Sequence, residues 1–300
     1  IKDLFHVHGK VGEGTFSSVY LATLKLSDGS KKFALKHLVP TRHPEKIERE
    51  LQCMQQIGGK DYVVGLELCL RNFETVIFVM PYMRHDKFSE YVQDMTVQET
   101  KDYMIALLTA LRRVHKFNII HRDILVIIYN YRSFFKKHML KRKSTEEKCY
   151  CFGKAKVCSL CISRPEQTAP RAGTPGFRAP EVLLKHPSQT PAIDIWASGV
   201  MMLCILSGTQ PFFHSPDDCT ALAEITTIFG SNKIQQCARK LGLKKIIFLN
   251  NLYFSLLLSL VSSDTQYPKE AYHLLLRLLD LDYKTRLTAD QALNHPFFKL

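Results

Sequence analysis

The sequence changes from a strand-like pattern to a helical pattern partway along its 300 residues. Apolar and polar side chains alternate over 8–82 as in β-strands, interrupted by one helical stretch at 44–56. From about residue 96 onward, apolar residues recur at helical spacing. The same spacing returns near the C-terminus, at 269–280 and 288–294. Strands followed by helices predict an α+β fold of two lobes, which we place at 1–82 and 83–300.

The composition excludes several classes of protein. With 46% hydrophobic and 23% charged residues, the chain can bury a large core and is neither disordered nor collagen-like. The formal net charge of +13 favours anionic partners such as nucleotides or acidic protein segments. No apolar run reaches the roughly 18 residues of a membrane span, so we expect a soluble chain without a membrane partner.

A glycine-rich turn near the N-terminus gives the first chemical signal. Gly12-Glu13-Gly14 lies between two predicted strands, where a bare backbone can approach phosphates closely. By itself the turn is equally compatible with an ordinary β-turn. However, Lys36 ends a later strand-like run, where its ammonium group could hold phosphates, and Glu50 on the predicted helix is its natural counter-ion. The combination favours a nucleotide site.

A series of further motifs follows in a fixed order. They are His121-Arg122-Asp123, Ala179-Pro180-Glu181, Asp194-Ile195-Trp196-Ala197-Ser198-Gly199 and finally Arg286. Together with the glycine-rich turn, Lys36 and Glu50, they resemble a eukaryotic protein kinase over about 11–298. The runs 12–22, 50–53 and above all 169–181 are similar to the cell division cycle 7-related kinases.

The resemblance implies a two-lobed protein-kinase-like fold, with a β-rich N-lobe and a larger helical C-lobe. Lys36 and Glu50 would form the ion pair that orients ATP, and Asp123 would accept the proton of the substrate hydroxyl. Asp194 and the pair of Glu181 with Arg286 would be structural. The implied nucleotide-binding residues are Val11, Gly12, Glu13, Gly14, Val19, Ala34, Lys36, Met80, Pro81 and Met83.

The resemblance also implies a biological setting. The family implies a nuclear Ser/Thr kinase that uses ATP and Mg²⁺, is activated by a regulatory subunit and phosphorylates acidic tails of the replicative helicase. Arg171 and Arg178 flank Thr174 and could pair with an acidic or phosphorylated residue after the target serine. For Arg178, a structural role within its own segment stays open as an alternative.

The sequence departs from the family pattern in the loop that follows Asp123. Leu125 and Ile128 occupy the places where the family has lysine and asparagine, and no aspartate occurs between Asp123 and Asp194. The Asp-Phe-Gly that holds magnesium is therefore absent. Two interpretations compete: a pseudokinase, or an incomplete or mis-joined version of an active kinase, which we favour. The apolar run 246–261 is either a buried helix or a junction artefact.

Nine cysteines without a secretory signal indicate a reducing compartment. Five occur singly and are interpreted as core residues. Cys149, Cys151, Cys158 and Cys161 form C-x-C-x6-C-x2-C within an insert at about 130–168, which predicts a structural Zn²⁺ site. Four unrelated thiols are the alternative. No recognition helix accompanies them, so direct nucleic-acid binding is not expected.

Overall fold

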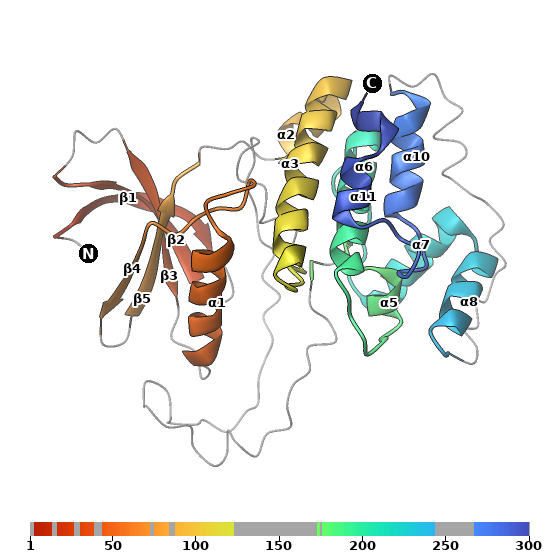
Figure 1. Ribbon diagram of the computed structural model, residues 1–300, viewed down its shortest axis with the longest axis horizontal. Coiled ribbons are helices and arrows are strands. Elements are labelled where there is room, and N and C mark those ends of the chain that lie inside the picture. The colour runs from red at the N-terminus through yellow and green to blue at the C-terminus, as the bar shows by residue number, and fades with distance from the viewer. Residues whose placement is uncertain are drawn as a thin grey trace, which may run out of the picture. The chain divides into compact units, whose positions relative to one another are not determined.

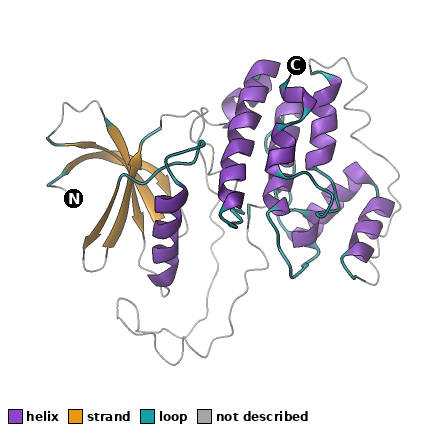
Figure 2. Cartoon of the chain, in the orientation of Figure 1, coloured by secondary structure: helices purple, strands orange, loops and turns teal. Residues whose placement is uncertain are grey.

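The computed structural model describes residues 3–13, 17–26, 31–38, 44–72, 75–83, 88–122, 173–174, 176–243 and 267–299. The chain divides into two units, whose described parts are 3–83 and 88–299. Strands and one helix form the first unit, and helices form the second (Figures 1 and 2). The predicted α+β class is confirmed.

The first unit is a five-stranded antiparallel sheet in the order β1-β2-β3-β5-β4, with one helix. Its elements are β1 (Phe5–Glu13), β2 (Ser17–Leu24), β3 (Lys32–Leu38), α1 (Pro44–Ile57), β4 (Leu68–Asn72) and β5 (Thr75–Pro81). One face of this sheet carries a hydrophobic core of Phe5, Ala22, Phe33, Leu35, Ile77 and Val79. Because successive strand residues point to opposite faces, Ala34 and Lys36 on β3 point away from this core. A site that uses Lys36 must therefore lie on the opposite face.

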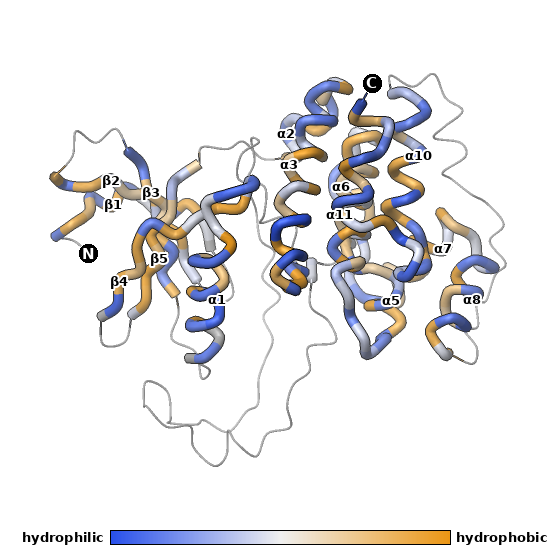
Figure 3. The backbone as a smooth tube through the Cα atoms, in the orientation of Figure 1, coloured by the Kyte–Doolittle hydropathy of each residue, from blue (hydrophilic) through white to orange (hydrophobic). Residues whose placement is uncertain are grey.

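The second unit is helical. Its elements are α2 (Phe88–Tyr91), η1 (Val92–Asp94), α3 (Val97–Lys116), α5 (Pro180–Leu183), α6 (Ala192–Ser207), α7 (Asp218–Phe229), α8 (Ser231–Lys240), α10 (Lys269–Leu278), α11 (Ala289–Leu293) and η3 (Pro296–Phe298). A capping box of Thr96 and Glu99 begins α3, since each residue's side chain binds the other's backbone amide. Hydrophobic and hydrophilic residues alternate along α3 and α10 (Figure 3).

Helix α6 forms the centre of this unit. All residues from Ile193 to Ile205 are buried, as expected for a helix that is apolar on nearly every side. Both α3 and α10 pack on it. The contact with α10 is close at Gly199, where an added Cβ would lie 2.7 Å from the side chain of Leu279. A larger residue at Gly199 would therefore push the two helices apart.

The helical predictions are confirmed to within a few residues, the usual uncertainty of helix ends. The stretches at 44–56, 269–280 and 288–294 correspond to α1, α10 and α11. Among the helices of the described ranges, none combines the length and apolarity that crossing a membrane requires.

The single cysteines do not share one environment. Cys204 and Cys237 are buried as predicted, and burial raises the pKa of Cys204 to about 12, so its thiol is unreactive. Cys219 is exposed on the first turn of α7, so its interpretation as a core residue was wrong. Its neighbours Asp217 and Asp218 face polar partners, which is why the start of this helix stays at the surface.

Candidate active site

The sheet face opposite the hydrophobic core brings four predicted nucleotide-binding residues together. Val19 on β2 pairs directly with Lys36 on β3, and Ala34 on β3 pairs with Met80 on β5. Directly opposed residues of an antiparallel pair share a face, and so do residues two apart on one strand. Val19, Ala34, Lys36 and Met80 therefore lie on one face, with an ammonium group beside apolar side chains.

An ion pair fixes the direction of the lysine on this face. Lys36 Nζ donates a hydrogen bond to Glu50 Oε1, which α1 presents from its middle. The two side chains are 26% and 39% exposed, and partly exposed pairs contribute little to stability, about 0–1 kcal/mol. The significance of the pair is therefore the orientation of the ammonium group, as the sequence predicts.

The other predicted nucleotide-binding residues lie along the edges of this face. Gly12 on β1 pairs with Val19, next to Val11 and Glu13 on the same strand. Gly14 lies outside the described residues. The predictions for these loop positions remain untested.

The backbone N–H groups at the end of β5 are not all available to a nucleotide base. Pro81 has no amide hydrogen. Tyr82 donates its own to the carbonyl oxygen of Lys32 at 3.0 Å. Neither residue therefore supplies an N–H group to a bound base, so any hydrogen bond that they make to a base would use a carbonyl oxygen.

Within the second unit, a buried carboxylate holds the backbone directly before Asp123. Asp194, at the start of α6, is fully buried and accepts hydrogen bonds from the amides of His121 and Arg122, both at 2.8 Å. His115 Nε2 donates a third at 2.9 Å. Arg122 has a φ of 67°, a left-handed conformation that these bonds help to maintain. Asp123 itself lies outside the described residues.

His115 is a functional residue that the sequence analysis missed. It lies on α3, 79 residues before Asp194, so only the fold brings them together. The signal in the sequence is weak: a polar residue at the end of an otherwise apolar helical stripe.

We expect His115→Ala to lower the free energy of unfolding by about 1–3 kcal/mol, because a buried carboxylate then loses one of its donors. His115→Gln keeps an N–H donor and should lose less. Urea denaturation followed by tryptophan fluorescence measures both, since the single Trp196 lies two residues from Asp194. Equal stability of His115→Ala and the parent protein would contradict this role of His115.

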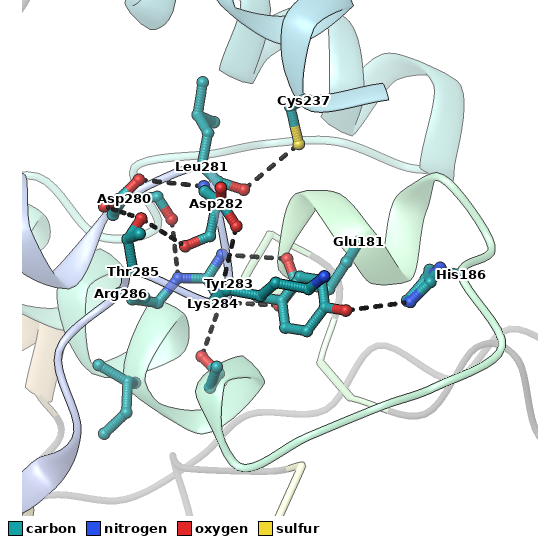
Figure 4. Close-up of polar contacts among 12 residues, drawn as sticks. Glu181, His186, Cys237, Asp280, Leu281, Asp282, Tyr283, Lys284, Thr285 and Arg286 are labelled. Carbon is teal, nitrogen blue, oxygen red and sulfur yellow. Dashed lines mark hydrogen bonds and ion pairs between the residues drawn. The ribbon is translucent and has the colours of Figure 1, made fainter. Parts of the chain in front are cut away.

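A second buried ion pair joins two distant parts of this unit. Arg286 Nη1 and Nη2 donate to the two carboxylate oxygens of Glu181 at 2.7 and 3.0 Å (Figure 4). The guanidinium also donates to the carbonyl oxygens of Ala192 and Asp280, and it lies over the ring of Trp196. With both side chains at 2% exposure or less, the structural role that the resemblance implies is well supported by contacts.

Arg178 is engaged within the protein. Its Nε and Nη2 donate to the carbonyl oxygen of Gly173 at 3.2 and 3.0 Å, and Nη1 donates to Asp218 Oδ1 at 2.6 Å. These contacts favour the structural alternative left open for Arg178, although they do not test substrate binding. Arg171 lies outside the described residues.

The predicted zinc ligands also lie outside the described residues. They are Cys149, Cys151, Cys158 and Cys161. Within the part of the chain that the structure describes, no group of three or more His, Cys, Asp or Glu side chains is placed to hold a metal ion. The zinc site therefore remains a prediction.

The fold and these contacts define a protein kinase, and comparison with known proteins agrees. The family model of the protein kinase domain matches residues 5–298 of this chain. The human cell division cycle 7-related protein kinase is 28% identical over 518 aligned positions, which cover 100% of this chain and 90% of that protein. Since 518 exceeds 300, the human protein carries long insertions relative to this chain.

Two further relatives support the same assignment. A non-specific serine/threonine protein kinase of Drosophila melanogaster is 30% identical, over 99% of this chain and 69% of its own length. The probable cell division control protein 7 homolog 2 of Encephalitozoon cuniculi is 33% identical, over 96% and 90%. The chain belongs to the Ser/Thr protein kinases and, within them, to the cell division cycle 7-related kinases.

Members of this family use ATP and Mg²⁺. The residues of this chain fit ATP, but they do not include the family's usual ligands for Mg²⁺. The face of Val19, Ala34 and Met80 with the oriented Lys36 suits a base and its phosphates. Magnesium prefers carboxylate and other oxygen ligands. The chain has Ile128 where the family has asparagine and no aspartate between Asp123 and Asp194, so it lacks the oxygen ligands of the family pattern for Mg²⁺.

Proposed function

We propose that this chain binds an adenosine nucleotide on the Lys36 face of the first unit, and that it derives from a kinase of the replication-initiation type with its own catalysis impaired. The observation that carries the proposal is the ion pair of Lys36 with Glu50 on the face that also holds Val19, Ala34 and Met80. A fixed ammonium group next to an apolar surface matches the two chemically different ends of a nucleotide.

The proposed impairment follows from the loop after Asp123. In phosphoryl transfer, bound Mg²⁺ would neutralise the charge that develops on the phosphates. Leu125 and Ile128 offer no donor atoms. The chain therefore retains residues that orient a nucleotide, whereas the charge neutralisation that transfer requires has no ligands to support it.

A second candidate function is a scaffold that binds nucleotide and a regulatory subunit without catalysis. The same apolar loop favours it, because a pseudokinase needs no metal ligands. Sequencing the transcript that encodes residues 123–150 distinguishes an incomplete version of an active kinase from a pseudokinase scaffold. An omitted segment encoding lysine, asparagine and Asp-Phe-Gly would support the incomplete-kinase interpretation, and an uninterrupted transcript would support the scaffold.

The biological setting is part of the proposal. The names of the relatives support a kinase of the cell cycle. We propose that its substrates are acidic segments of replication proteins, including subunits of the replicative helicase. We infer an activating regulatory subunit and a nuclear location on the same basis. The excess of basic residues, +13, is compatible with acidic partner segments.

We expect Lys36→Met to weaken nucleotide binding by about ten- to a hundredfold, because a hydrogen bond to a charged group contributes about 1.5–3 kcal/mol. Isothermal calorimetry with ATP, and the thermal shift that ATP produces, measure the loss. The matched control is Lys31→Met, which removes an equal charge from an exposed pair with Glu67.

Magnesium provides the second arm of this experiment. The thermal shift that ATP produces should be the same with and without Mg²⁺, since the chain lacks ligands for the metal. ATP binding that is unchanged by Lys36→Met would overturn the proposed nucleotide site. A shift that requires Mg²⁺ would instead contradict only the proposed loss of metal binding.

A further inference from the structure

Two adjacent aspartates at the start of α7 have different partners. Asp217 is the N-cap of the helix: its carboxylate accepts from the amides of Cys219 and Thr220 at 2.8 and 2.9 Å. These bonds, the one from the Thr220 amide above all, hold the pKa of Asp217 below its usual value. Asp218 instead turns to Arg178, whose Nη1 donates to its Oδ1 at 2.6 Å. Only the second aspartate neutralises the arginine.

Arg178 lies beside the backbone that leads into Asp123. Its guanidinium clamps the carbonyl oxygen of Gly173 through Nε and Nη2. Gly173 has a φ of 111°, and a Cβ added there would lie 2.9 Å from the carbonyl oxygen of Arg122. Arg178 is therefore anchored to a residue that lies close to Arg122, the residue directly before Asp123.

We propose that Asp218 is a specificity-determining residue that occupies Arg178 and competes with an anionic group of the substrate. The inference rests on the proposed function and on the expectation from the sequence that Arg178 pairs with an acidic or phosphorylated residue after the target serine. Because Asp218 already supplies a carboxylate, a substrate anion must either displace it or lie next to it. Displacing Asp218 costs free energy because an ion pair is lost. Placing the substrate anion next to Asp218 costs free energy because like charges repel.

The competition affects different anions unequally. Arg178 and Asp218 are 15% and 17% exposed, so their opposite charges offset one another in a mostly desolvated setting. A glutamate of the substrate only exchanges one carboxylate for another. A phosphoserine carries about −1.5 to −2 charge and three acceptor oxygens, so it gains more than it displaces. Asp218 therefore weakens the binding of a glutamate more than it weakens the binding of a phosphoserine.

The test uses three fluorescent peptides that differ only in the residue after the acceptor serine: phosphoserine, glutamate or alanine. Their binding to the full chain is measured by fluorescence anisotropy, which does not require catalysis. We expect Asp218→Asn to bind the glutamate peptide about three- to tenfold more tightly, with little change for the alanine peptide. The preference for phosphoserine over glutamate should fall accordingly. The gain should shrink as salt rises, since screening weakens the repulsion.

Asp217→Asn is the charge-matched control. Asparagine caps helices about as well as aspartate, and the same net charge is lost one residue away from the ion pair. This variant should leave all three affinities near the parent values. Thermal unfolding midpoints of both variants verify that α7 stays folded.

The outcomes separate the inference from the function on which it rests. If Arg178→Gln abolishes discrimination among the peptides but Asp218→Asn changes nothing, Arg178 binds the anion and the competition is refuted. If Arg178→Gln also changes nothing, Arg178 recognises no anion and the substrate role fails together with the inference, whereas nucleotide binding through Lys36 is unaffected. Weaker binding of the glutamate peptide by Asp218→Asn would overturn the inference, because Asp218 would then position Arg178.

Discussion

Purified protein of this sequence is expected to transfer the γ-phosphate of ATP at least about a thousandfold more slowly than the 1 to 100 per second typical of kinases. A thousandfold corresponds to about 4 kcal/mol of transition-state stabilisation, since each 1.36 kcal/mol is a factor of ten. Stabilising the transferred charge through a metal supplies several kcal/mol. With Ile128 in place of the asparagine and no Asp-Phe-Gly, we expect this contribution to be lost.

A radiolabelled transfer assay with an acidic protein substrate measures this rate. Asp123→Asn provides the control for contaminating kinases, since turnover that persists unchanged in this variant does not come from the site. Turnover within the typical range that disappears in Asp123→Asn would contradict the predicted impairment. The chain would then hold its metal through residues other than those of the family pattern.

Breaking the Glu181–Arg286 pair from one side is expected to cost about 3–5 kcal/mol of unfolding free energy. In Arg286→Met, the carboxylate of Glu181 stays buried without its bidentate partner. The carbonyl oxygens of Ala192 and Asp280 lose a donor as well. Glu181→Leu leaves the guanidinium uncompensated and should cost a similar amount. Urea denaturation gives both values.

The double variant Glu181→Leu/Arg286→Met tests the reason for this loss. Replacing a whole buried pair by apolar residues is often close to neutral, so much of the stability should return. Lys240→Met removes the exposed pair with Asp282 and should leave the unfolding midpoint unchanged. If Arg286→Met behaves like Lys240→Met, the pair is not the structural brace that its burial indicates.

Local patterns in the sequence were sufficient to predict the strand-rich first unit with its one helix, and the helices α3, α10 and α11. Alternation along β3 separates Leu35, in the core, from Ala34 and Lys36 on the opposite face. Helical spacing alone places Glu50 on α1. Both patterns reflect the direction of side chains from a regular backbone, which depends only on residues close in sequence.

Long-range pairs could not be predicted in the same way. Asp218 lies 40 residues after Arg178, and His115 lies 79 residues before Asp194. Nothing in the alternation of apolar residues distinguishes Asp218 from Asp217, because the difference arises only when α7 packs beside 173–178. The partner of Arg286 was an exception, since the resemblance to a family supplied it.

Helix α6 has a consequence for how this chain can evolve. At its first turn, the carboxylate of Asp194 accepts a hydrogen bond from the backbone amide of His121, two residues before Asp123. The carbonyl oxygen of Ala192 accepts one from the guanidinium of Arg286. None of these hydrogen bonds involves a residue of 123–172. These contacts of the described residues do not depend on turnover. A lineage that abandons catalysis can inherit the scaffold intact.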